Sequence, residues 1–354
     1  MSVPQLCSAG RGLGFLSHRG FAFEIGNPFR AQAVGAESPR LFAKCDCAIS
    51  SHGNRCPHPI TGWPWEADCM ADASRSSTLI GTLDRHVAVA SSFVEPRNVG
   101  VWLPPEYDPS PGRRYATIYA HDGQNLFEPP NAFGGVDWGL DATLSCLIRQ
   151  GQVRQTIVVG IWNTAERWRE YMPQKPLEGP TRSAERDRFA EQNGGQPLSD
   201  GYLRFIVEEL KPWIDANYPT LPGRESTYLI GSSMGGLISL YALCEYPHRF
   251  GAAACLSTHW PAGEGLMIDY LRHALPAPGV HRIYFDYGTE TLDAGYEVWQ
   301  RQADQIMRTA GYRTGVDWIT SKFVGAEHSE RAWRDRLHLP LRFLLQPSMA
   351  PEPT

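Results

Sequence analysis

The hydrophobic positions of this chain repeat with two alternating periods, which predicts strands separated by helices. Runs of apolar or alternating residues typical of strands lie at residues 86–93, 99–103, 115–120, 155–161, 226–230, 252–256, 282–287 and 318–324. Segments with helical character lie at residues 140–147, 201–217, 237–243, 267–275, 296–310 and 337–345. Strands that alternate with helices imply right-handed βαβ units, so we predict an α/β fold with a mostly parallel central sheet and helices on both faces.

The pattern covers only part of the 354-residue chain. Residues 1–76 are rich in Gly, Ser, Arg, Pro and Cys and show no sustained period, so we expect a poorly structured, non-essential extension. Translation that starts naturally at Met70 is one alternative. A zinc site is another, although paired C-x-x-C spacing is missing; its ligands would come from Cys45, Cys47, His52, Cys56, His58 and Cys69. We expect residues 77–346 to form one domain with a polar insertion or lid at 178–200, and residues 347–354 to form a tail.

Composition narrows the class of partner. The net charge is −5 and no long basic run occurs, which argues against nucleic acid or an anionic membrane as the main partner. No apolar run approaches the roughly 18 residues of a transmembrane helix. Arg11, His18 and Arg19 interrupt any apolar core of a signal peptide, so we predict a cytoplasmic protein. The pattern specifies no oligomeric state.

One glycine-rich turn carries the first candidate for chemistry. Gly231, Ser233 and Gly235 fit the pattern G-x-S-x-G between a predicted strand and a predicted buried helix. This pattern is the nucleophile elbow of α/β-hydrolases, where a strained turn projects the serine hydroxyl and the glycines let strand and helix approach closely. On its own, the motif could also be an ordinary glycine-rich loop. In this context we predict that Ser233 is a nucleophile.

A serine nucleophile needs a base that takes its proton and an acid that orients the base. In α/β-hydrolases the acid and then the histidine follow the serine along the chain, each after a strand. His328 follows the last predicted strand, so we predict that it is the base rather than an ordinary surface histidine. The acid should follow the strand at 282–287, where Glu290 and Asp293 are both candidates; we favour Asp293.

The negative oxygen of a tetrahedral intermediate needs two N–H donors. One should be the backbone of Met234, and the other should come from the loop after residues 115–120, from Gly123 or Gln124. Loops at the same edge of the sheet carry aromatic and charged residues that could line a pocket, although aromatic residues in loops also serve as core anchors. The predicted substrate contacts are Asp122, Trp162, Tyr171 and Trp260.

Several motifs together resemble the putative esterase family, which includes the esterase D and enterochelin esterase-like hydrolases. They are HDGQNLF at 121–127, REYMP at 169–173, KPWID at 211–215, GSSMGG at 231–236 and GAEHSE at 325–330, followed by Trp333. The resemblance spans residues 85–346, and it implies a serine-dependent acyl hydrolase of the α/β-hydrolase fold that uses no metal or other cofactor. It implies Ser233 and His328 as nucleophile and base, and Gln124 and Met234 as oxyanion donors. The family's acid often lies at the position of Thr291, two residues before Asp293.

The resemblance also implies a range of small-molecule ester substrates. The family includes enzymes for siderophore trilactones, feruloyl and acetyl-xylan esters and S-formylglutathione, as well as mycolyl transferases. We predict a serine carboxylic-ester hydrolase that forms an acyl-enzyme, with a siderophore-type or other small ester as substrate. The alternatives are an acyltransferase or serine peptidase on the same fold, and a non-catalytic binding protein that has kept the fold.

Overall fold

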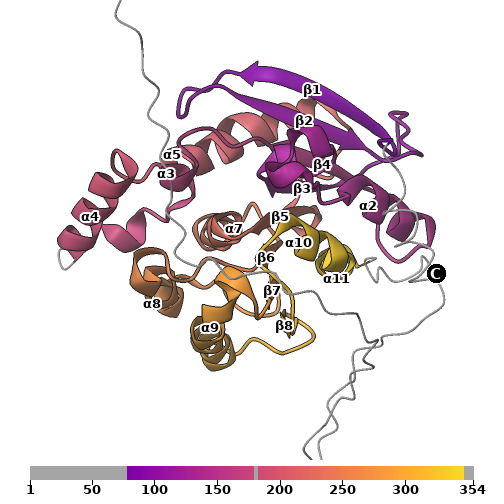
Figure 1. Cartoon of the computed structure of the whole chain (residues 1–354). Helices are drawn as coiled ribbons and strands as arrows, with labels where there is room; N and C mark the ends of the chain where they lie inside the picture. Colours follow the sequence, from indigo (N-terminus) through magenta and orange to yellow (C-terminus); the bar gives the residue numbers. More distant parts are fainter. Residues whose placement is uncertain (1–77, 179–181, 347–354) are drawn as a thin grey trace, which may run out of the picture. The chain divides into compact units, whose positions relative to one another are not determined.

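The strands form one eight-stranded sheet in the order β1-β2-β4-β3-β5-β6-β7-β8. The computed structural model describes residues 78–178 and 182–346. The strands are β1 (Thr82–Val89), β2 (Arg97–Leu103), β3 (Ala116–His121), β4 (Thr156–Ile161), β5 (Thr227–Ser232), β6 (Ala252–Leu256), β7 (Arg282–Tyr287) and β8 (Trp318–Lys322). β2 pairs antiparallel with β1 and β4, whereas all other pairings are parallel (Figure 1). The predicted mostly parallel sheet is confirmed.

Helices cover both faces of this sheet. They are α2 (Leu140–Arg149), α3 (Arg167–Tyr171), α4 (Ser183–Asn193), α5 (Ser199–Arg204), the π-helical η6 (Phe205–Leu210), α6 (Lys211–Asn217), α7 (Met234–Glu245), α8 (Leu266–Ala274), α9 (Glu297–Thr309), α10 (Glu330–Arg336) and α11 (His338–Leu344). Side chains of a strand point to alternate faces. In β5, Tyr228 and Ile230 therefore join the core under α2, α10 and α11, whereas Leu229 joins the core under α5 to α9.

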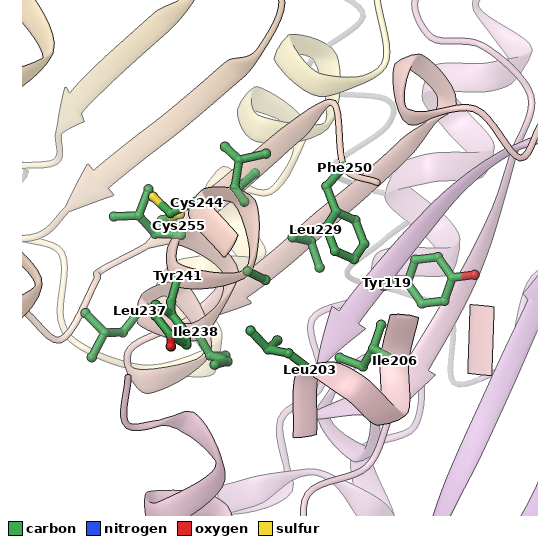
Figure 2. Packing of buried hydrophobic residues seen from close by; sticks show 14 of the residues in the cluster. Tyr119, Leu203, Ile206, Leu229, Leu237, Ile238, Tyr241, Cys244, Phe250 and Cys255 are labelled. Carbon is green, nitrogen blue, oxygen red and sulfur yellow. The ribbon is translucent and has the colours of Figure 1, made fainter. Parts of the chain in front are cut away.

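Helix α7 directly follows the glycine-rich turn and is buried along almost its whole length. Every residue from Met234 to Cys244 is buried, because α7 packs on β5 and β6 on one side and on α3 and α8 on others. Figure 2 shows Leu237, Ile238 and Tyr241 of this helix within the larger core cluster. Each fully buried Leu or Ile side chain stabilises the folded state by about 1.5–3 kcal/mol relative to an exposed one. This packing fixes the start of α7, and with it the turn, at the carboxyl edge of the sheet.

The structure differs from the predicted elements in a few places. The first strand runs from Thr82 to Val89 rather than from residue 86 to residue 93, and its pairing with β2 shifts register between His86 and Val89. The predicted helix at 201–217 is divided into α5, η6 and α6, and Pro212 lies in the first turn of α6, where a missing N–H is tolerated. Helices α3, α4 and α10 were not predicted.

Some predictions fall outside the described residues. These are the extension at 1–76, the start at Met70, the zinc alternative and the tail at 347–354. Within the described ranges, no three His, Cys, Asp or Glu side chains are grouped so that they could hold a metal ion. None of the helices in this part of the chain has both the length and the apolar character needed to cross a membrane.

Candidate active site

Ser233 forms the sharp turn between β5 and α7. Its backbone has φ 56° and ψ −122°, a conformation that residues with a side chain rarely adopt, so the turn is strained as the motif predicted. Gly231 permits the turn, because a Cβ atom there would lie 2.4 Å from the carbonyl oxygen of Gly235. The Ser233 N–H donates to the carbonyl of Leu256 in β6 at 2.9 Å, which fastens the turn to the neighbouring strand. The Ser233 side chain is only partly buried.

His328 and Asp293 come together from the loops after β8 and β7. Nδ1 of His328 lies 2.5 Å from Oδ1 of Asp293. Burial raises the pKa of Asp293, but hydrogen bonds from His328, Ser257 and the Gly288 backbone outweigh it and hold the pKa below its usual value. Asp293 is therefore ionised at neutral pH and accepts the Nδ1 proton, which leaves the lone pair of His328 on Nε2.

The second acid candidate, Glu290, lies away from His328. Its side chain is exposed, and Oε1 accepts a hydrogen bond from the hydroxyl of Thr289 at 3.2 Å. The side chain of Asp293, in contrast, is fully buried against the imidazole. Thr291 accepts the backbone N–H of His328 at 2.8 Å and so supports the loop rather than the imidazole. The geometry therefore favours Asp293 over Glu290 as the partner of His328.

Tyr296 connects the Ser233 turn with the His328 loop. Its ring packs edge-to-face on the imidazole rings of His328 and His259, with centroid distances of 5.7 and 5.9 Å. Burial, followed by the charge of Asp293, raises the pKa of Tyr296, and a hydrogen bond with the Ser233 side chain opposes this rise. The His259 backbone N–H in turn donates to the Ser233 carbonyl at 3.1 Å, and Nδ1 of His259 lies 2.6 Å from the Tyr296 hydroxyl. Tyr296 and His259 therefore link the turn of the predicted nucleophile to the predicted base.

The loop after β3 lies against the start of α7. Asp122 has φ 55° and ψ 47° and leads into the 3-10 turn η1 (Gly123–Asn125). A Cβ atom on Gly235 would lie 3.4 Å from Oδ2 of Asp122, so the loop and the first turn of α7 are in close contact. Gln124 and Met234, the predicted oxyanion donors, therefore lie on neighbouring segments at the same edge of the sheet.

Replacing Gly123 by alanine is a test of this loop. The added Cβ would lie 2.4 Å from the carbonyl carbon of Gly160 in β4, so the turn that carries Gln124 must shift. Because loss of one oxyanion donor costs about 10²–10³-fold in kcat, we expect kcat for a short p-nitrophenyl ester to fall about 100-fold. The matched control is Gly295→Ala, whose Cβ would meet no atom within 4 Å. An unchanged kcat in Gly123→Ala would contradict the role of the loop.

Asp122, a predicted substrate contact, is bound by its own neighbours. Arg167 donates from Nε to Oδ1 and from Nη2 to Oδ2, both at 2.7 Å, and Asn163 donates to Oδ1 at 2.6 Å. Burial raises the pKa of Asp122, but Arg167 and then Asn163 reverse the effect and lower it. Only 3% of Asp122 is exposed. Asp122 is therefore buried and holds the loop in place, so the structure does not support the predicted contact with a substrate.

Tyr171 and Trp260, two further predicted contacts, also belong to the interior. They are 0% and 1% exposed. The Tyr171 hydroxyl accepts the backbone N–H of Asp122 at 3.2 Å, and the indole N–H of Trp260 donates to Gln300 at 2.9 Å. Both rings are core anchors of their loops, which is the alternative that the sequence left open. The structure therefore corrects these predictions as well.

Trp162, the fourth predicted contact, is partly exposed and borders a cavity of about 250 Å³. The cavity lies between the loop with Gly123 and Gln124 and the ribbon formed by β1 and β2. The backbone N–H of Asn163 donates to Oε1 of Gln124 at 3.3 Å, which ties this loop to the end of β4. Contact between Trp162 and a substrate stays a prediction.

Sequence reasoning missed two residues of the site, Ser257 and Tyr296. Ser257 directly follows β6, the strand next to the Ser233 turn, and Tyr296 directly precedes α9 after the acid loop. Both residues lie at the ends of predicted elements, and this position was the signal in the sequence that could have marked them as site residues. His259, which follows β6, also lies at the site, with its Nδ1 2.6 Å from the Tyr296 hydroxyl. Burial, followed by the nearby charges of His328 and Arg167, lowers the pKa of His259 to about 4.

Comparison with known proteins identifies relatives of this chain. The uncharacterized protein YbbA of Bacillus subtilis (strain 168) is 28% identical over 213 residues, which cover 59% of this chain and 72% of YbbA. The ferri-bacillibactin esterase BesA of the same organism is 30% identical over 203 residues, 53% of this chain and 62% of BesA. The chain thus spans less than two thirds of the length of BesA.

Solved structures agree on the fold. The ferulic acid esterase AmCE1/Fae1A from Anaeromyces mucronatus is similar with a TM-score of 0.55 and 18% identity, covering 76% of this chain and 92% of that chain. At this identity the likeness shows the fold alone, and the predicted α/β-hydrolase fold is confirmed. A family model described as "Putative esterase" matches residues 90–344, which is most of the chain. The chain therefore belongs to the putative esterase family and is a carboxylic ester hydrolase.

Proposed function

We propose that this hydrolase works through a Ser233–His328–Asp293 triad and an acyl-enzyme. The Ser233 hydroxyl attacks the ester carbonyl while Nε2 of His328 takes its proton, and the alcohol leaves with that proton. His328 then activates water, which releases the acid and regenerates Ser233. Asp293 keeps the Nδ1 proton in place and stabilises the imidazolium that forms in both steps. The 2.5 Å contact between His328 and Asp293 is the observation that carries this proposal, and the positive φ of Ser233 in the turn before α7 supports it.

The oxyanion of each tetrahedral intermediate would be bound by the backbone N–H groups of Met234 and Gln124. Met234 is the first residue of α7, whose N-terminal N–H groups have no partner within the helix. The positive end of the helix dipole adds to the attraction of a negative oxygen. The close contact between Asp122 and Gly235 supports a second donor from the η1 turn.

We propose a siderophore-type or other small ester as the substrate, with residues 77–346 as the catalytic domain. Two of the similar proteins bear names that refer to ferri-bacillibactin and ferulic acid, so esters of these two kinds are the first to test. Gln124 lines the cavity beside Trp162, whereas the three triad residues do not, so this cavity would hold a part of the substrate beyond the scissile ester.

A panel of esters tests the proposal. It should contain a catechol-siderophore lactone, a feruloyl ester and short p-nitrophenyl esters, with the Ser233→Ala protein as blank. We expect the wild-type enzyme to hydrolyse at least one small ester, and the Ser233→Ala protein to hydrolyse none of them faster than buffer alone. Addition of an alcohol acceptor and of a peptide set separates hydrolysis from the alternatives, acyl transfer and peptidase activity. If the wild-type protein hydrolyses none of these substrates and does not react with a fluorophosphonate probe, the result would favour the alternative of a non-catalytic binding protein.

A further inference from the structure

Ser257 is a buried serine that contacts Asp293 on the side away from His328. It follows β6, is 0% exposed, and has a positive φ of 41°. Its Oγ lies 2.6 Å from Oδ2 of Asp293. Two donors approach the same Oγ, the indole N–H of Trp333 at 3.0 Å and Nη2 of Arg336 at 2.8 Å. One hydroxyl thus meets three polar groups inside the protein.

The direction of the Ser257 hydroxyl proton follows from the chemistry of these groups. An indole N–H and a guanidinium can donate hydrogen bonds but cannot accept them. Trp333 and Arg336 therefore use the two lone pairs of Oγ, and the only acceptor at hydrogen-bond distance among the described residues is Asp293. The hydroxyl must donate to Oδ2 of Asp293.

A buried ion pair holds this arrangement. Arg336 donates from Nε and Nη2 to the two carboxylate oxygens of Asp286 at 3.1 and 2.9 Å, and both side chains are at most 4% exposed. The backbone N–H of Ser257 donates to Oδ1 of Asp286 at 3.1 Å. Because a buried ion pair with several hydrogen bonds has few alternative geometries, Arg336 presents its N–H to Ser257 from a fixed position.

We propose that Ser257, oriented by Trp333 and Arg336, is a positioning residue for the triad acid. This inference rests on the triad proposed above. Ser257 and the backbone N–H of Gly288, at 2.6 Å, both donate to Oδ2 of Asp293. Rotation of the carboxylate would break both bonds, so Oδ1 stays directed at Nδ1 of His328. The hydroxyl also spreads the negative charge of Asp293, which moderates its attraction for the imidazolium.

The test must account for every ionisable group near Asp293. His328 contacts Oδ1, Tyr296 from the start of α9 is close enough to be affected by the charge of Asp293, and beyond Ser257 lie Arg336 of α10 and Asp286 of β7. His259 and Glu330 also lie close enough to His328 for its charge to affect their pKa values. Because the Ser257 variants leave both of these groups in place, a difference between variant and wild-type enzyme in the acidic limb of the pH profile of kcat/KM reports on the coupling between Asp293 and His328.

Ser257→Ala removes the hydroxyl and keeps a similar backbone preference. A hydrogen bond to a charged group is worth a factor of about 10 to 100, so we expect kcat to fall about 10-fold or more while KM changes less than about twofold. Without its hydroxyl donor, Asp293 attracts the imidazolium more strongly, so the acidic limb of kcat/KM should move up by about 0.5 pH unit. An unchanged kcat together with an unchanged limb would overturn the proposal.

Two further variants separate positioning from stability. Ser257→Gly also lacks the hydroxyl but tolerates positive φ, so it should show the same loss and the same limb shift if Ser257→Ala folds poorly. The control is Thr227→Val at the opposite end of β5, where a buried hydroxyl donates only to the Gly223 carbonyl at 3.0 Å. Thr227→Val should lower the melting temperature without shifting the acidic limb of the pH profile of kcat/KM. A Ser257→Gly protein that behaves like Thr227→Val would contradict the positioning role.

The proposed triad is checked separately in the same series. Stoichiometric fluorophosphonate labelling of the Ser257 variants would show that their nucleophile is intact. Suppose that Ser233→Ala is inactive, while the Ser257 variants keep full kcat and an unshifted acidic limb of the kcat/KM profile. Then only the positioning role of Ser257 is refuted. If Ser233→Ala keeps its activity, the triad itself fails.

Discussion

Ser233→Ala is expected to lower kcat/KM for short p-nitrophenyl esters at least about 10³-fold. The acyl-enzyme needs an oxygen nucleophile at the tip of the turn, and alanine supplies none. The remaining activity would come from the oxyanion donors and from substrate binding alone. We would measure kcat/KM by release of p-nitrophenol, with burst kinetics to show whether an acyl-enzyme still accumulates.

The Ser233→Ala protein should remain folded, which makes the loss of activity interpretable. The contacts of Ser233 with Leu256, Leu237 and His259 use its backbone and survive the substitution. Ser232→Ala is the matched control, because Ser232 is the adjacent serine and ends β5 with 4% exposure. It should keep activity within a few-fold of the unchanged enzyme. Substantial hydrolysis by Ser233→Ala, or equal losses in both variants, would refute the assignment of the nucleophile.

Asp293→Asn has the second largest expected effect, a loss of about 10³–10⁴-fold in kcat. An asparagine NH₂ directed at His328 would require Nδ1 to accept, which moves the imidazole proton to Nε2 and removes the base. The reverse orientation would direct the NH₂ at two donors, the hydroxyl of Ser257 and the N–H of Gly288, each 2.6 Å from Oδ2. Neither orientation reproduces the carboxylate, because that carboxylate accepts three hydrogen bonds and donates none.

Glu290→Gln is the matched control for the acid. Glu290 is exposed and lies in the same loop, so its loss of charge should leave kcat within about twofold. Both variants are assayed with the same p-nitrophenyl ester across pH 5–9. Equal and mild losses in the two variants would show that the acid is neither of them.

The sequence predicted best where the signal is local. The glycines around Ser233 report a close approach of backbone segments, and the strand and helix beside them are strongly apolar, so the turn could be identified from a few residues. His328 was reached through chain order, since it follows the last strand of a βαβ series. Asp293 and Glu290 lie in one short loop, and only the buried contact with the imidazole distinguishes them.

Tertiary contacts explain where sequence reasoning was wrong. Asp122, Tyr171 and Trp260 are loop residues of the right chemical type for a pocket, yet each is turned inward by a partner distant in sequence, such as Gln300 for Trp260. A loop aromatic that faces a ligand and one that anchors a core have the same local pattern. Ser257 was missed for the same reason, because its role depends on Trp333 and Arg336 of α10.

The most direct test of the central claim is to locate the site of covalent modification. The enzyme is treated with a fluorophosphonate, digested, and mapped by mass spectrometry, with Ser233→Ala and Ser232→Ala treated in parallel. We predict one adduct per chain, on Ser233, present in Ser232→Ala and absent from Ser233→Ala. An adduct on another residue, or undiminished labelling of Ser233→Ala, would contradict the proposed mechanism.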